Sequence, residues 1–269
     1  MKIIAVFLAV ILSIVVMGNL SFKSKIKKEV KELFKNSPDT KKEIIKEEDI
    51  TNLPEPIQRY LRYSRIIGKE KIKAVRLKQK GQIRREGKKW MAIKAEQYYS
   101  AGRPGFIWVA NMNIVKVRDK YIEGKGNMLI KLLSIFVLGE AKGPEMDEAS
   151  LMRYFNEMMW FPTEYLSDKI KWETIDKNSA KATYTDGALS CQAALYINEQ
   201  CQLVNFIAKR YNSDRKKLFK WSTPISEYRE VNGLRLPVKG EAIWHLDTGD
   251  FCYIKLEVTD IEYNNPEMY

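Results

Sequence analysis

The sequence contains a single histidine, His245, and only three cysteines, Cys191, Cys201 and Cys252. One histidine excludes a His-rich metal site, and no pair of cysteines has the CxxC spacing of many metal and redox motifs. An odd number of cysteines without a framework spacing also argues against a disulfide scaffold. We therefore predict no metal site, no cofactor and no catalytic residue that a motif could identify.

Acidic residues are scarce between Arg59 and Lys94, where fourteen Lys or Arg are opposed by only two Glu. This window has a net charge of +12, which equals that of the whole chain. Two interpretations remain open: a solvated edge strand protected by its charges, or contact with anionic lipid headgroups at a membrane surface. Few aromatic residues are interleaved with the charges, so nucleic acid is not an expected partner. The predicted basic face consists of Arg76, Lys78, Lys80 and Arg84.

One long apolar run is present, from Ile3 to Leu20, with Ser13 and Asn19 as its only polar residues. As a helix it would be about 27 Å long, just enough for a bilayer core of about 30 Å. We predict a retained transmembrane anchor and a cell-membrane localisation with a single N-terminal span; a cleaved signal peptide is the alternative. The lysines after the run favour a cytoplasmic domain by the positive-inside rule, whereas the usual exporting role of such a run favours the extracytoplasmic side, which we adopt.

The remaining pattern divides the chain into an anchor at 1–20, a charged helical tether at 21–49 and one β-rich domain at 50–269. In the tether, apolar residues at helical spacing form a stripe that either continues the anchor along the membrane surface or packs on the domain. A Pro-containing segment at 36–39 ends the helix. The stripe consists of Phe22, Ile26, Val30, Leu33 and Phe34.

Beyond Ile72 the hydrophobic period changes from helical to two, which is typical of strands with one inner and one outer face. Short turn signals, such as Asn232-Gly233, separate successive strands. The predicted fold is mainly β (α+β), a curved antiparallel meander sheet or partial barrel of about ten strands. Two or three helices pack on it, in addition to the N-terminal transmembrane helix.

Two helices are predicted inside this β pattern. The first, Met128 to Leu138, is apolar nearly all round and too short to span a membrane, so we interpret it as a buried or lid-like helix. The second begins at Asp147 and ends before Pro162. On it, Glu157 lies four residues after Arg153 and off the apolar stripe, which predicts a surface ion pair, with a catalytic acid as the alternative.

The aromatic and Met side chains of the domain either fill its core or line a cavity for an apolar ligand, with the lid-like segment covering it. The residues predicted to line this pocket are Trp108, Met128, Leu132, Phe136, Trp160, Tyr228 and Trp244.

The segment LPEPIQRYLRY at 53–63 resembles the start of an uncharacterised bacterial family, a domain of unknown function. The resemblance continues through WFPT at 160–163 and GLRLP at 233–237, and covers roughly residues 50–263. The family implies no established activity and no site residues. Its strand-rich pattern is also similar, at the level of the fold, to lipoprotein-carrier half-barrels that hold acyl chains.

Our leading hypothesis is a non-enzymatic, membrane-tethered module that binds an apolar or lipid-like ligand in the concavity of a curved sheet. The expected partners are a membrane and a lipid or apolar small molecule. One alternative is an enzyme whose pocket uses Glu157, Arg210 and His245, with Tyr228. The other is an envelope scaffold that binds protein partners through an exposed apolar patch.

Overall fold

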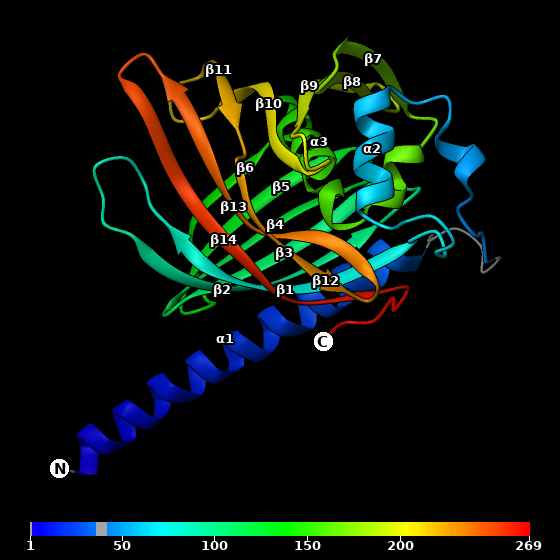
Figure 1. Cartoon of the computed structure of the whole chain (residues 1–269). Helices are drawn as coiled ribbons and strands as arrows, with labels where there is room; N and C mark the ends of the chain where they lie inside the picture. The colour runs from blue at the N-terminus through cyan, green and yellow to red at the C-terminus, as the bar shows by residue number, and fades with distance from the viewer. Residues whose placement is uncertain (1, 36–41) are drawn as a thin grey trace.

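A computed structural model describes residues 2–35 and 42–269 of the chain, in which fourteen antiparallel strands form one strongly curved sheet (Figure 1). The order is β6-β5-β4-β3-β2-β1-β14-β13-β11-β10-β9-β8-β7, and β12 pairs with β13 alone. Two meanders, β1–β6 and β7–β14, are therefore joined where the first strand pairs with the last. The strands are β1 Ala74–Ile83, β2 Met91–Ser100, β3 Gly105–Met112, β4 Val115–Ile122, β5 Lys125–Leu132, β6 Phe136–Lys142, β7 Ile170–Asp176, β8 Ser179–Asp186, β9 Leu189–Ile197, β10 Leu203–Asn212, β11 Lys217–Ser222, β12 Ile225–Val231, β13 Leu234–Leu246 and β14 Gly249–Tyr263.

The helix α3, Pro144–Glu157, connects the two meanders and lies in the hollow of the sheet, against β4, β5, β9 and β10 (Figure 1). It approaches β5 closely at Gly126, where a Cβ atom would collide with the backbone oxygen of Met146. The Gly126 amide donates a hydrogen bond of 2.7 Å to the Asp147 carboxylate in the first turn of α3. A glycine at this position thus allows the helix to pack into the hollow.

The main core lies between α3 and the concave face of the sheet. Rings on α3 stack on rings of the second meander: the centroids of Tyr154 and Tyr184 are 6.0 Å apart, and those of Phe155 and Phe206 are 5.2 Å apart. The helix α2, Glu55–Tyr63, closes one end of this core over β8 and β9. Three short 3₁₀ helices complete the described helical segments: Glu47–Ile50, Met158–Trp160 and Pro162–Leu166.

The helix α1, Lys2–Lys35, is a single element whose second half packs on the outer face of β2 and β3. Its apolar stripe is buried there, against Tyr98 and Ile107 among others. On the same side of the helix, the buried Glu29 forms ion pairs with Arg118 and Lys120 of β4 at 3.4 and 3.1 Å. Of the two interpretations of the stripe, packing on the domain is therefore confirmed. The expected helix end at 36–39 lies outside the described residues.

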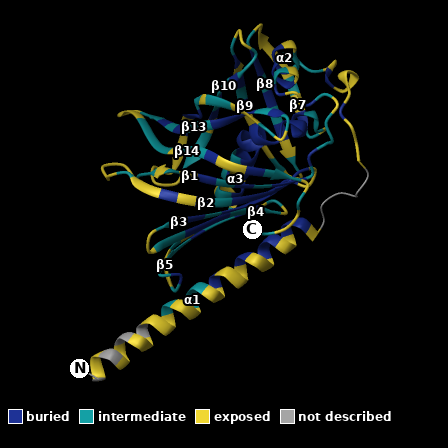
Figure 2. Ribbon diagram, turned by 60° about the horizontal axis from the view of Figure 1, so that its bottom comes forward, coloured by how far each residue is buried: buried dark blue, intermediate teal, exposed yellow. Residues whose placement is uncertain are grey.

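The first half of α1 projects beyond the sheet, and most of its described large apolar side chains, such as Phe7, Val10 and Leu12, are exposed (Figure 2). Within the described residues, no helix is long and apolar enough to cross a membrane. The prediction of a transmembrane helix is therefore wrong, and so is the prediction of a cell-membrane localisation with a single N-terminal span. The apolar run is not a separate element, because it continues without a break into the Lys-rich half that packs on the sheet.

The predicted fold class is also wrong in the number of strands, which is fourteen rather than about ten. The segment Met128 to Leu138 is not a lid-like helix but most of the β5–β6 hairpin. Its turn places Leu133 and Ser134 at φ angles of 52° and 64°, without the Gly or Asn that usually marks such a turn. A further strand, β11, precedes β12, and Pro224 lies between the two.

Candidate functional site

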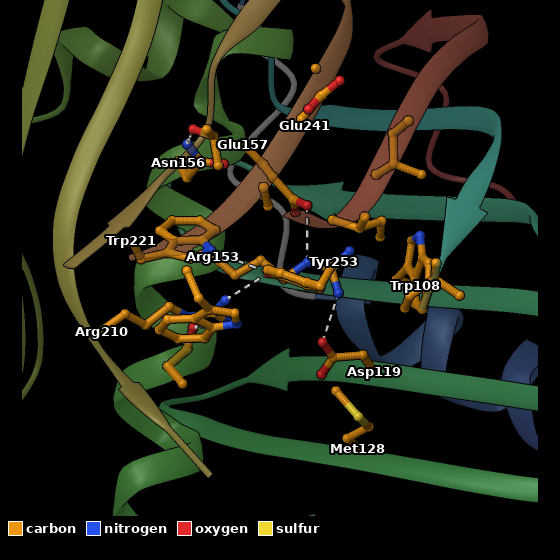
Figure 3. A pocket seen from close by; sticks show the side chains of 18 of the residues that line it. Trp108, Asp119, Met128, Arg153, Asn156, Glu157, Arg210, Trp221, Glu241 and Tyr253 are labelled. Carbon is orange, nitrogen blue, oxygen red and sulfur yellow. Dashed lines mark hydrogen bonds and ion pairs between the residues drawn. The ribbon is translucent and has the colours of Figure 1, made fainter. Parts of the chain in front are cut away.

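The hollow of the sheet contains a cavity of about 530 Å³ between α3 and strands of both meanders (Figure 3). This volume is within the usual range of small-molecule sites. The polar edges of three indoles in its wall are already occupied: the indole N–H groups donate to Gln79 Oε1 at 2.9 Å, Pro237 O at 3.0 Å and Tyr253 Oη at 3.3 Å. The remaining ring surface is apolar. The aromatic residues of the wall are Trp108, Trp160, Tyr211, Trp221, Trp244 and Tyr253.

A buried charge cluster forms one side of the cavity. The Arg153 guanidinium, on α3, binds Asp119 Oδ2 on β4 at 2.7 Å and Glu157 Oε1 at 2.9 Å (Figure 3). Burial works to lower the pKa of Arg153, but the two carboxylates outweigh it and raise that pKa above its ordinary value. Glu157 also accepts hydrogen bonds from Gln97 and Tyr99, at 2.8 and 3.0 Å. The Arg153–Glu157 pair is therefore buried, and its prediction as a surface pair is wrong.

A second guanidinium in the wall, that of Arg210 on β10, has different surroundings. Its carbon lies 4.7 Å from the ring centroid of Trp221 and 5.9 Å from that of Trp244. Its terminal nitrogens donate long hydrogen bonds to Tyr253 Oη at 3.4 Å and to the Ala149 carbonyl at 3.2 Å. Its Nε is buried without a hydrogen-bond partner in the part of the chain that the structure describes.

The predicted pocket residues are only partly brought together. Trp108, Met128, Trp160 and Trp244 line the cavity. Leu132 and Phe136 lie at the outer end of the β5–β6 hairpin, where Phe136 is 59% exposed. The Tyr228 hydroxyl donates to the Leu203 carbonyl at 2.8 Å, away from the cavity.

The predicted basic face lies along β1, where carboxylates of β14 face three of its four cations. Arg76 binds Glu262 at 2.7 Å, Lys78 is 3.6 Å from Asp260, and Lys80 is 3.2 Å from Glu257. Arg84 instead donates to the Cys252 carbonyl and covers the Trp90 ring at 4.4 Å. Cross-strand pairing thus places a carboxylate opposite three of the four cations of this face.

The residues of the enzyme alternative do not converge. Glu157 and Arg210 line the cavity, but His245 points to the opposite face of the sheet from its neighbour Trp244. There, His245 Nε2 is 2.8 Å from Ser222 Oγ, and its Nδ1 is 2.7 Å from Asp250 Oδ1. The order of these contacts resembles that of a hydrolase triad, but Ser222 is only 2% exposed, so a substrate carbonyl has little access to its hydroxyl.

Metal binding has no support from the same region. Among residues 2–35 and 42–269, no group of three or more His, Cys, Asp or Glu side chains is arranged to hold a metal ion.

Several wall residues were missed by sequence reasoning, above all Asp119 and Asn156. Asp119 comes from a strand with mixed charges, VKVRDKYI, and nothing local distinguishes it from a solvated carboxylate. For α3 a signal did exist: Ala149, Arg153 and Asn156 follow one another at helical spacing on one face.

The comparisons with known proteins agree on the family and the fold. The model of a family of unknown function, DUF6544, matches residues 43–256. No curated protein matches the chain. The family resemblance expected from the LPEP, WFPT and GLRLP segments is thereby confirmed.

Two solved structures are similar to this chain at low identity. A DUF1329 family protein from Desulfovibrio piger is 12% identical, with a TM-score of 0.45, over 78% of this chain and 92% of the other. A LolA superfamily protein from Nitrosomonas europaea is 9% identical, also with a TM-score of 0.45, over 78% and 94%. The expected similarity to lipoprotein-carrier half-barrels is present, but at this level it gives no information about a ligand.

Proposed function

Because the chain belongs to the DUF6544 family of unknown function, we propose its function from the geometry alone: a non-enzymatic module that binds an apolar or lipid-like ligand in the hollow of its curved sheet. The observation that supports this proposal is the cavity of about 530 Å³, whose wall combines four Trp with Met and aliphatic side chains. Burying an apolar molecule there would remove its surface from water at roughly 25 cal/mol per Å².

The polar groups of the wall support binding rather than catalysis. Asp119 and Glu157 are both engaged by Arg153, so neither carboxylate is free to act as a general base. His245, the only histidine of the chain, lies on the other face of the sheet.

Filling the cavity should abolish ligand binding. Ala149 lies in the wall on the half-buried side of α3, so Ala149→Trp places a large ring inside the hollow. We expect a loss of at least about tenfold in affinity for the neutral fluorophore N-phenyl-1-naphthylamine, measured by its fluorescence increase on binding to the full chain. The matched control is Glu148→Trp, at an exposed position one residue earlier that is not part of the wall. Equal affinity in Ala149→Trp and the unaltered chain would contradict a ligand site in this cavity.

Membrane association is the second part of the proposal. Its support is the row of exposed apolar side chains on the first half of α1, which includes Phe7, Val10 and Ile14 at 65%, 51% and 50% exposure. Exposed apolar patches of this kind are typical of membrane or protein contacts.

Negative charges introduced into this apolar row of α1 should release the protein from a membrane surface. We expect the full chain to co-sediment with vesicles of phosphatidylglycerol and phosphatidylethanolamine, and the double variant Val10→Asp/Ile14→Asp to stay in the supernatant. Leu218→Asp, at a 59% exposed position on β11, is the control and should still sediment. Absence of vesicle binding together with self-association in analytical ultracentrifugation would instead favour the scaffold alternative.

A further inference from the structure

Arg210 has hydrogen-bonding capacity that the protein leaves unused. A guanidinium carries five N–H donors, and Arg210 uses only two contacts, both long, to Tyr253 Oη and the Ala149 carbonyl. Its Nε is buried and has no acceptor among the described residues. The two terminal nitrogens carry two N–H groups each and use one contact each, so they retain N–H groups that can bind an acceptor brought by a ligand.

The charge of Arg210 is also unmatched, in contrast to that of Arg153 in the same wall. Arg153 has two carboxylates within 2.9 Å. Within residues 2–35 and 42–269, no carboxylate forms an ion pair with Arg210, whose contacts are the two neutral acceptors and the faces of Trp221 and Trp244. A guanidinium stacked on indoles in this way has its edge free for a planar or tetrahedral oxyanion.

A cationic headgroup would compete with the protein's own cations at two ring faces of the wall. Arg153 lies over Trp108 at 4.9 Å, and Arg210 lies over Trp221 at 4.7 Å. A ligand cation would therefore meet positive charge at these faces.

Arg210 lies where a headgroup of an amphipathic ligand would be placed. Exposed residues near it in the wall, Ser213 and Asp214 in the β10–β11 turn and Glu145 at the start of α3, mark the opening of the cavity. Buried residues, such as Trp108 and Trp160, form its interior. Figure 3 shows Arg210 beside Trp221 on one side of the cavity and Trp108 on the other.

We propose that the ligand is an amphiphile with an apolar chain and an anionic oxygen headgroup, a carboxylate or a phosphate monoester, and that Arg210 binds this headgroup at the mouth while the chain fills the Trp-lined interior. This inference rests on the proposed function and specifies its ligand class. Two parallel N–H···O contacts from the guanidinium edge would orient the headgroup.

Twelve-carbon ligands that differ only in the headgroup test the proposal: dodecanoate, dodecyl phosphate, dodecanol and dodecyltrimethylammonium, each below its micellar concentration. Their affinities for the full chain are measured by displacement of N-phenyl-1-naphthylamine, which is neutral and reports on the apolar cavity alone. We expect at least one of the two anions to bind about tenfold or more tightly than dodecanol, and the cation no better than dodecanol. The stronger anion identifies the headgroup as carboxylate or phosphate.

Substitution of Arg210 should remove this preference and nothing else. In Arg210→Gln the anions should bind like dodecanol, while dodecanol and the neutral fluorophore bind as before. The control Lys142→Gln removes a positive charge from the exposed rim of the same cavity. It should keep the preference for anions even at low salt, where exposed charges are least screened. If Arg210→Gln also loses the fluorophore, Arg210→Lys decides the question, because it keeps the charge and should retain a reduced preference for anions.

Two results would overturn the inference in distinguishable ways. Anions and dodecanol binding equally to the unaltered chain, or a preference that survives in Arg210→Gln, would refute the anionic headgroup and leave apolar binding intact. Failure of the fluorophore and of every ligand to bind the unaltered chain would refute the proposed function, and the inference with it.

Discussion

Arg153→Ala is expected to lower the free energy of unfolding by about 4 kcal/mol, because it leaves two buried carboxylates without their partner. The side chains of Asp119 and Glu157 are only 3% and 7% exposed, so both carboxylates would be left poorly solvated. The substitution also removes the cation that covers the rings of Phe106 and Trp108. Urea unfolding followed by tryptophan fluorescence measures the loss.

A charge-neutral triple variant separates electrostatics from packing. In Asp119→Asn/Arg153→Met/Glu157→Gln no charge of this cluster remains, and the side chain of Met retains much of the packing volume of Arg. We expect this variant to recover most of the lost stability, since replacing a whole buried ion cluster is usually far less costly than removing one partner. Equal destabilisation in the single and triple variants would show that packing, and not the unpaired charge, determines the effect.

Glu164→Gln is expected to abolish a pH dependence of stability of about 3 kcal/mol between roughly pH 4.5 and pH 7. Glu164 is 2% exposed, and burial raises its pKa to about 7, against the opposing effect of the Gly102 amide, which donates to both carboxylate oxygens at 3.2 Å. Because the folded pKa is above the unfolded one, the native state binds the extra proton in this window. The stability that this proton contributes is therefore present at low pH and lost as the pH rises towards 7.

The comparison of unfolding free energies at pH 5 and pH 7.5 measures this effect. Gln is the neutral isostere of protonated Glu, so its amide oxygen can still accept from Gly102. The difference in stability between the unaltered chain and Glu164→Gln should shift by about 2.5 kcal/mol in favour of the variant as the pH rises. Glu199→Gln, at an exposed position, should show no such shift. A Glu164 variant whose stability follows that of the unaltered chain at both pH values would disprove the raised pKa.

Where backbone conformation is set by local residues, the sequence identified the element correctly. The Asn232-Gly233 pair predicted a hairpin, and both residues have the positive φ angles, 54° and 75°, of the turn between β12 and β13. The β5–β6 hairpin was missed because Leu133 and Ser134 take the same backbone region without that preference. Their conformation is determined by the pairing of the flanking strands and by contact with α1, where Ser134 donates to Asn19 at 2.6 Å.

The candidate site depends on contacts that are distant in the sequence. Arg153 and Glu157 are one helical turn apart and were recognised as a pair, but their burial depends on Asp119, which is 34 residues away from Arg153. In the same way, the contacts of Arg210 come from α3 and β14, 61 and 43 residues away. Local spacing could not show that one arginine has two carboxylates and the other has none.

By itself the sequence determined the β character of the domain, the Asn-Gly hairpin and the family, because alternation, turn chemistry and short motifs are local properties of the chain. Only the tertiary structure decided where the apolar run of α1 lies relative to the sheet, which face of the sheet encloses a cavity, and which charged side chains in the cavity wall have no partner of opposite charge. These depend on the pairing of β1 with β14 and on the position of α3 in the hollow, and such long-range contacts have no signature at any single position.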